Sequence, residues 1–238
     1  MHVTQRKTMF CLSLIFGMIC YEKLCAETFY KTGFEASAEE FGNFKDTAVN
    51  TQNGWKGSGK IVHGTFRSDS QLLTPGPGSG LYGACCIMRL EKTIKTDTIW
   101  VDMSVNLAAD APLGAWVWLL GTNAGTSTNI LSTYLAFYKT GITAHSYNVE
   151  SGARKNEEIA VMMEPGTWYR LTIAFHCKKH TYDVYINGEL KKGDIVFFGH
   201  KDYGYAENLS EVRLGGGASK VSLAYYDDLY IGDASPLK

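Results

Sequence analysis

Beyond residue 26 the sequence has no apolar run of the roughly 20 residues needed to cross a bilayer. It also has no run of lysines or arginines, and its formal net charge is −1, so it lacks the basic surface that nucleic acids require. Prolines are scarce, with five beside 25 glycines, a balance that fits strands and tight turns rather than a disordered linker. No segment shows helical periodicity. These absences favour a soluble all-β protein that inserts into no membrane and binds no nucleic acid.

The first 26 residues have the order of a signal peptide. The basic residues Arg6 and Lys7 precede an apolar run that is too short to span a bilayer. Ala26 then provides a small residue at a cleavage point. We therefore expect residues 1–26 to be removed and residues 27–238 to form one secreted domain, either extracellular or, in a bacterium, periplasmic.

Three cysteines remain after this leader: Cys85, Cys86 and Cys177. Their number is odd and their spacing matches no metal site. Neighbouring residues on a strand point to opposite faces, so only one of Cys85 and Cys86 could pair with Cys177. Two interpretations stay open, namely buried small apolar residues or a single disulfide.

Alternation of apolar and polar residues recurs through the chain and predicts half-buried strands. A slip of one residue would expose a strand's whole apolar set, so the alternation also fixes which residues face the core. Asn187-Gly188 predicts a two-residue hairpin turn. The expected core comprises Ile99, Val101, Met103, Leu135, Phe137, Leu171, Ile173, Phe175, Val184 and Ile186.

Four segments resemble a known family. PGTWYRLT at 165–172 and YDVYINGEL at 182–190 resemble the central hairpin of LamG-like domains in the concanavalin A-like lectin/glucanase superfamily. TGFE at 32–35 is similar to the opening strand of these domains, and YDDLYIG at 226–232 to their closing strand. The resemblance implies an all-β, two-sheet antiparallel jelly-roll sandwich. Because the superfamily holds lectins, recognition modules, glucanases and polysaccharide lyases, it does not select a function.

The resemblance places ligands on the concave sheet. Sugar binding needs flat aromatic faces and planar polar groups, and both occur opposite the aliphatic sets. The alternative is that these aromatic side chains pack inside the sandwich or on its convex side; Trp116 and Trp118 lie in an apolar run, and we expect them to be buried. The expected ligand-binding residues are Trp100, Asp102, Asn106, Tyr134, Tyr138, Arg170, Asp183 and Tyr185.

Glu35 and Asp228 raise the question of a metal. The resemblance implies one structural Ca²⁺ where the first and last strands meet, and calcium prefers oxygen ligands such as these carboxylates. The alternative is that Glu35 is an exposed strand acid and that Asp228 marks a turn.

For function, we expect a non-catalytic module that binds a glycan or cell-surface carbohydrate. Retaining glucanases of the superfamily carry two glutamates bracketing an aspartate on one strand, and that arrangement is missing here. A polysaccharide lyase is the second hypothesis, since His145 and Tyr147 share a strand face and Arg170 could neutralise a uronate. A structural or protein-binding module of an envelope is the third.

Overall fold

The computed structural model describes residues 26–34, 48, 50, 52–63, 71–74, 85–107, 115–159, 161–216 and 224–237. Within these ranges the chain forms strands and turns, and no helix is present that is long and apolar enough to span a bilayer. Residues 1–25, which hold nearly all of the expected leader, and Glu35 lie outside the described residues.

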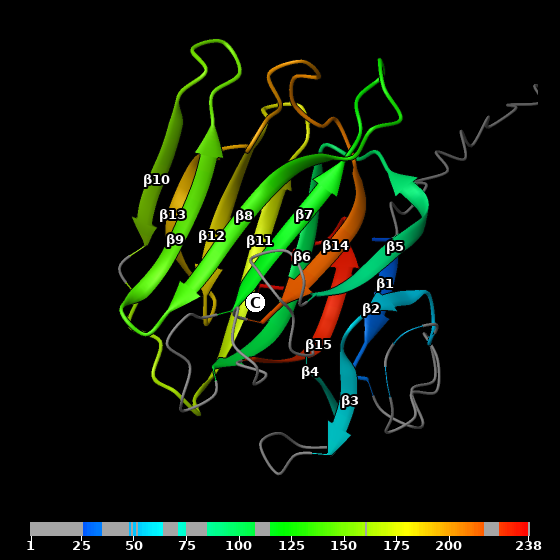
Figure 1. Cartoon of the computed structure of the whole chain (residues 1–238), viewed down its shortest axis with the longest axis vertical. Helices are drawn as coiled ribbons and strands as arrows, with labels where there is room; N and C mark the ends of the chain where they lie inside the picture. Colours follow the sequence, from blue (N-terminus) through cyan, green and yellow to red (C-terminus); the bar gives the residue numbers. More distant parts are fainter. Residues whose placement is uncertain are drawn as a thin grey trace, which may run out of the picture.

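The strands form two antiparallel sheets that pack face to face, as the sequence predicts (Figure 1). Sheet A, from edge to edge, contains β13 (Glu189–Val196), β12 (Thr181–Ile186), β11 (Trp168–His176), β6 (Thr98–Leu107), β15 (Ala224–Gly232), β4 (Gln71–Thr74) and β3 (Lys60–His63), and β1 (Thr28–Thr32) also pairs with β15. Sheet B contains β10 (Arg154–Ile159), β9 (Gly141–Tyr147), β8 (Ile130–Tyr138), β7 (Trp116–Gly121), β14 (Leu209–Gly215), β5 (Cys85–Ile94) and β2 (Trp55–Gly57).

The core between the sheets is the predicted one. All ten expected residues are buried, from Ile99 on β6 to Ile186 on β12. Alternation within each strand explains this result, because every second side chain of a strand faces the opposite sheet. The register that the aliphatic sets imply is therefore confirmed.

The hairpin between β12 and β13 also forms as expected. Asn187 and Gly188 both have positive φ, 52° and 82°, which is the geometry that a two-residue turn needs for matching the twist of its strands. The side chain of Asn187 accepts a hydrogen bond from the backbone N–H of Arg170, at 2.9 Å. The turn is therefore also tied to the neighbouring strand β11.

The TGFE motif at 32–35 begins at the last residue of the first strand, whereas the resemblance implies that it forms the opening strand. β1 spans Thr28–Thr32, so Thr32 is the last residue of this strand, and Gly33 and Phe34 follow it outside any strand. Phe34 has a positive φ of 59° and is buried against Trp55, with ring centroids 5.6 Å apart. The left-handed conformation at Phe34 ends the strand and turns its ring into the core.

The three cysteines are buried and free. Cys86 and Cys177 belong to the main core, whereas Cys85 points to the outer face of sheet B. The first interpretation, that the three cysteines are buried apolar residues, is therefore confirmed, and none of the three forms a disulfide. Burial raises the pKa of Cys177 to about 12, so this thiol is unreactive at neutral pH.

A second apolar cluster covers part of the outer face of sheet B. It contains Cys85, Trp116, Trp118 and Leu120, packed against Tyr134 and two further side chains. Trp116 and Trp118 are 5% and 6% exposed, so the expected burial of both tryptophans is confirmed. They are buried outside the main core, on the surface that faces away from sheet A.

Candidate functional site

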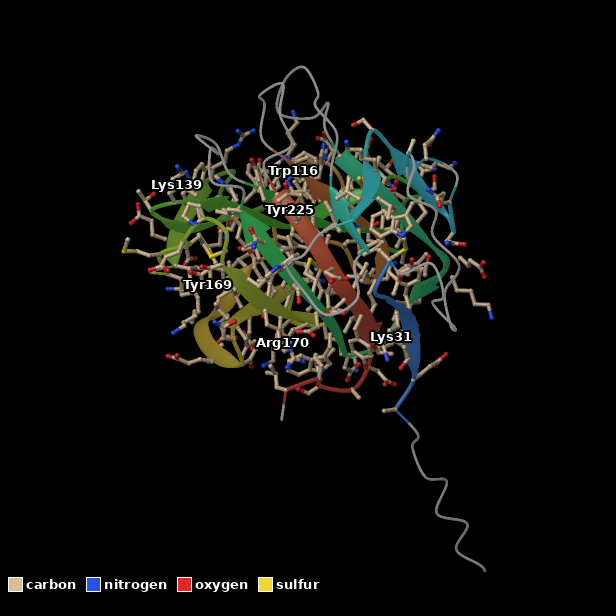
Figure 2. All side chains as sticks on the ribbon, turned by 90° about the horizontal axis from the view of Figure 1, so that it is seen from below. Lys31, Trp116, Lys139, Tyr169, Arg170 and Tyr225 are labelled. Atoms are coloured by element: carbon tan, nitrogen blue, oxygen red, sulfur yellow. The ribbon has the colours of Figure 1, made fainter. Side chains whose placement is uncertain are left out.

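The predicted ligand-binding residues do not form one surface. Arg170 lies on the outer side of sheet A and Trp116 on the outer side of sheet B, at opposite sides of the sandwich (Figure 2). Tyr134 and Tyr138 belong to β8 of sheet B, opposite the other six. Those six, on β6, β11 and β12 of sheet A, are Trp100, Asp102, Asn106, Arg170, Asp183 and Tyr185.

On sheet A the carboxylate of Asp102 is already bound by other side chains of the protein. Both oxygens of Asp102 accept hydrogen bonds from Arg170 Nε, at 3.0 and 3.1 Å, and one also accepts from the Thr172 hydroxyl. Arg170 reaches further and donates to the carbonyl of Pro236 at 2.9 Å. Asp102 and Asn106 are almost fully buried. This network joins β6, β11 and the C-terminal segment, and it leaves few polar groups for a ligand.

The edge of the same face is also internally paired. Asp183 accepts from the backbone N–H of Asp194 at 2.8 Å and lies 3.1 Å from His176 Nε2. Trp100 and Tyr185 remain half-buried, with ring centroids 5.9 Å apart and planes tilted by 45°. Sheet A therefore offers one tilted aromatic pair above a satisfied polar network.

Sheet B has a different arrangement, in which planar side chains follow one another across five strands. The paired positions in neighbouring strands are Arg213 with Trp118, Trp118 with Tyr134, Tyr134 with His145, and His145 with Asn156. Directly paired residues have Cβ atoms about 5 Å apart and lie on the same face. We call Arg213, Trp118, Tyr134, His145 and Asn156 the sheet B row.

The rings of this row contact one another. Trp118 meets Tyr134 edge to face at 5.3 Å, and Tyr134 stacks on His145 at 4.2 Å. Trp116 extends the series, with its ring 4.4 Å from Trp118. From Trp118 onward exposure increases along the row, since Trp118 is buried, Tyr134 and His145 are half-buried, and Asn156 is exposed. The accessible members are therefore the segment from Tyr134 to Asn156 and, on the other side of Trp118, the half-buried Arg213.

Hydrogen bonding fixes the orientation of the His145 ring. Its Nδ1 lies 2.8 Å from the side-chain oxygen of Asn156, and because that oxygen can only accept, Nδ1 carries the proton. Nε2 is buried and has no hydrogen-bond partner. Burial lowers the pKa of His145, and the Asn156 hydrogen bond only partly opposes this effect. The neutral form of the imidazole is therefore favoured, and because Nε2 is buried the ring contributes apolar surface rather than a hydrogen bond.

An ion-pair network lies beside the row. Glu211 on β14 is fully buried and accepts hydrogen bonds from Arg89 Nε at 2.9 Å, from Asn129 Nδ2 at 3.3 Å and from Arg213 Nε. The guanidinium groups belong to neighbouring strands, Arg89 to β5 and Arg213 to β14. Two positive charges thus surround one negative charge, at the end of the row that holds the tryptophans.

The residues of the lyase hypothesis are not brought together. His145 and Tyr147 lie on the outer face of β9 in sheet B, whereas Arg170 lies on the outer face of sheet A, beyond the core. Alternation correctly placed all three outside the core. It could not show that a sandwich has two outer faces and that these residues lie on different ones.

Asp228 lies at a bulge in β15. The pairing with β6 shifts between Asp227 and Tyr230, and Asp228 has a positive φ of 51°. This extra residue points out of the strand, and its carboxylate accepts from the Ser104 hydroxyl at 3.4 Å. It lines a hollow of about 320 Å³ together with Lys31, Thr32, Gly33, Asp102, Tyr230 and Pro236.

The described residues contain no group of three or more His, Cys, Asp or Glu side chains that could hold a metal. Of the two acidic side chains that line the hollow, Asp228 is exposed, whereas Asp102 is bound by Arg170 and Thr172. A carboxylate oxygen is the kind of ligand that calcium prefers.

Comparison with known proteins was informative at the level of structure. No protein-family model matches the sequence, and no curated protein matches it either. Among solved structures, the globular domain of T. cruzi calreticulin superposes with a TM-score of 0.55 at 13% identity, covering 88% of this chain and 89% of that chain. A carbohydrate esterase from the Shiga toxin-encoding bacteriophage phi24B gives 0.59 at 12% identity, covering 88% of this chain and 100% of the other.

The binding domain of botulinum neurotoxin DC, solved in complex with SialylT, gives a TM-score of 0.50 at 10% identity. It is matched over 86% of this chain and 47% of the neurotoxin chain, so this chain spans about half of that length. Identities this low show the fold alone. The protein is a two-sheet antiparallel sandwich with the fold of the concanavalin A-like lectins and glucanases.

Proposed function

We propose that the protein is a secreted, non-catalytic recognition module that binds a neutral or weakly charged glycan through the outer face of sheet B. One observation carries the proposal, namely the row of planar side chains from Trp118 through Tyr134 and His145 to Asn156. A cross-strand row on a rigid sheet holds its members at fixed spacing, so little order has to be created on binding.

The chemistry of the row suits a sugar. A pyranose presents C–H groups on its flat faces and hydroxyl groups around its edge. Tyr134 and His145 stack on each other and are half-exposed, so together they offer apolar ring surface, and Asn156 adds an amide that can donate and accept. Dispersion and a few hydrogen bonds leave a modest surplus after ordering costs, so we expect weak to moderate affinity.

The neighbours in structure are compatible with this proposal at the level of the fold. They include a neurotoxin binding domain solved with SialylT and a carbohydrate esterase, so the sandwich is used for recognition as well as for chemistry. Secretion is supported by the order of charged and apolar residues in positions 1–26.

The test is a glycan array probed with residues 27–238, followed by calorimetry on the strongest ligand. Tyr134→Ala should weaken binding at least tenfold without unfolding the protein, because it removes the stacking face. Tyr185→Ala is the matched control, since it removes a half-buried tyrosine from sheet A. Loss of binding in the control alone would move the site to sheet A.

Catalysis would overturn the non-catalytic part of the proposal. Polysaccharide elimination creates an unsaturated uronate that absorbs in the ultraviolet. We expect no such product when acidic polysaccharides are incubated with the protein. Product that appears with the native chain and disappears with His145→Ala would establish a lyase instead.

We also propose a structural Ca²⁺ at Asp228, near the end of the first strand. The support is the outward carboxylate at the β15 bulge and the hollow that it shares with Thr32 and Gly33. Glu35, the second expected ligand, lies outside the described residues.

A further inference from the structure

Two arginines beside the sheet B row share one buried carboxylate. Glu211 is enclosed by the protein, with 1% of its side chain exposed, and it receives the Nε–H of both Arg89 and Arg213. A buried carboxylate needs such partners, because an unpaired buried charge is costly. The carboxylate in turn orients both guanidinium groups.

The terminal Nη nitrogens of these two arginines have no partner within the described residues. Arg89 and Arg213 form no other hydrogen bond or ion pair within the described part of the chain. Their side chains are 60% and 25% exposed, so the terminal Nη groups can meet solvent or a ligand. Since Glu211 neutralises only one of the two charges, the cluster retains a charge of about +1.

The cluster lies next to the aromatic rings. Arg213 is the cross-strand neighbour of Trp118, and Tyr134 lies one strand further. Adjacent strands are about 4.8 Å apart, so the backbone of Arg213 is about 10 Å from that of Tyr134. Trp118, between them, is 6% exposed, so a ligand that touches both the stacked rings and the arginines has to bridge this buried residue.

We propose that this site is specific for an acidic sugar, whose carboxylate or sulfate group is bound by Arg89 and Arg213 while a neighbouring ring stacks on Tyr134 and His145. The inference rests on the proposed function and narrows its ligand class to glycans that carry an anionic group here. Arginine suits this role because its planar fork donates two parallel hydrogen bonds to an anion. Because Glu211 already holds the Nε–H of each arginine in place, less conformational entropy is lost when the exposed Nη groups bind an anion.

The experiment uses three oligosaccharides that differ at one terminal residue: glucuronate, a sulfated glucose and plain glucose. Calorimetry with residues 27–238 should show that at least one of the acidic ligands binds about tenfold or more tightly than the neutral one, which corresponds to about 1.4 kcal/mol. The preference should shrink as salt concentration rises. The two acidic ligands separate a carboxylate specificity from a sulfate specificity.

Arg89→Gln is the decisive variant, because this residue is well exposed and its loss still leaves Arg213 on Glu211. It should abolish the acidic preference, so that the acidic and the neutral ligands bind with equal affinity. Arg154→Gln is the matched control, since it removes an exposed arginine from the edge strand of the same sheet. The control should retain the preference.

The outcomes separate the two proposals. Equal affinity for all three ligands, or a preference that survives Arg89→Gln, would refute the acidic-sugar inference and leave glycan binding standing. If none of the three binds and the glycan array is also empty, the proposed function itself fails. A preference lost equally in Arg154→Gln would show a general charge effect, and it too would refute the arginine site.

Discussion

Ile173 lies at the centre of β11, where it pairs with Val101 on one side and Val184 on the other. It is completely buried. Ile173→Ala should therefore lower the free energy of unfolding by about 2–5 kcal/mol, through lost transfer energy and the cavity that remains. Urea denaturation measures this change. Leu190→Ala, at a residue 52% exposed, should stay within about 0.5 kcal/mol. A loss below about 1 kcal/mol for Ile173→Ala would contradict the register.

Gly215 makes room for the ring of Trp116. A Cβ atom at this position would lie 1.9 Å from the indole, whereas one at Gly125 would meet its nearest atom at 3.6 Å. Gly215→Ala should force the ring to move and destabilise the fold by about 1–3 kcal/mol. Near-ultraviolet circular dichroism should report the disturbed Trp116–Trp118 pair. The signal should be unchanged in Gly125→Ala; an unchanged signal in Gly215→Ala as well would show that the ring does not lie over this glycine.

Among the elements, the edge strands β10 and β13 are linked across the side of the sandwich. Glu157 on β10 lies 3.0 Å from Lys192 on β13 and 3.0 Å from Lys155 on its own strand. Burial alone would raise the pKa of Glu157, but the bonds and charges of the two lysines outweigh it and lower the pKa below its usual 4.5. The charged form is therefore favoured by folding.

A lowered pKa in the folded state gives stability above the unfolded pKa, and this stability is lost as pH falls through the folded pKa. We expect Glu157→Gln to lower the free energy of unfolding by about 0.5 kcal/mol at pH 7, because the lysines are largely exposed and the pair is screened. At a pH below the folded pKa the variant and the native chain should be equally stable. Denaturation at both pH values tests this, and a difference that persists in acid would assign the effect to packing.

Sequence predicted the strands whose two faces differ most. β6, β8 and β11 carry apolar residues at alternate positions over much of their length, and these residues lie in the core, although many of the side chains between them are buried as well. β10 was not predicted, because an edge strand with the sequence RKNEEI buries only Ile159 fully and has almost no apolar period. Its charged residues suit an edge, since they discourage pairing with another chain.

The candidate site was only partly predictable for a related reason. Alternation places Trp100 and Tyr134 outside the core but cannot assign them to the same outer face, because the order of strands in a sheet depends on long-range pairing. Pairing likewise makes Arg213 the neighbour of Trp118, although 94 positions separate them in the sequence. The row is therefore visible only when the register of sheet B is known.

For the whole molecule, calcium at Asp228 should raise the melting temperature. A ligand that binds only the folded state stabilises it by mass action, by about 2.7 kcal/mol at a concentration one hundred times its dissociation constant. EDTA should lower the melting temperature of the native chain, and Asp228→Asn should remove that difference. Melting curves that are identical with and without the chelator would end the calcium proposal.

The position of β15 bears on how the protein acquires its fold during synthesis. This strand follows all the other described strands in the sequence, yet it lies inside sheet A, between β6 on one side and β4 and β1 on the other. Until residues 224–232 leave the ribosome, β1, β3 and β4 have no connection to the rest of sheet A, and β6 has an open edge. Sheet A therefore cannot close before residues 224–232 have been made, and until then the edge of β6 stays open to pairing with other chains.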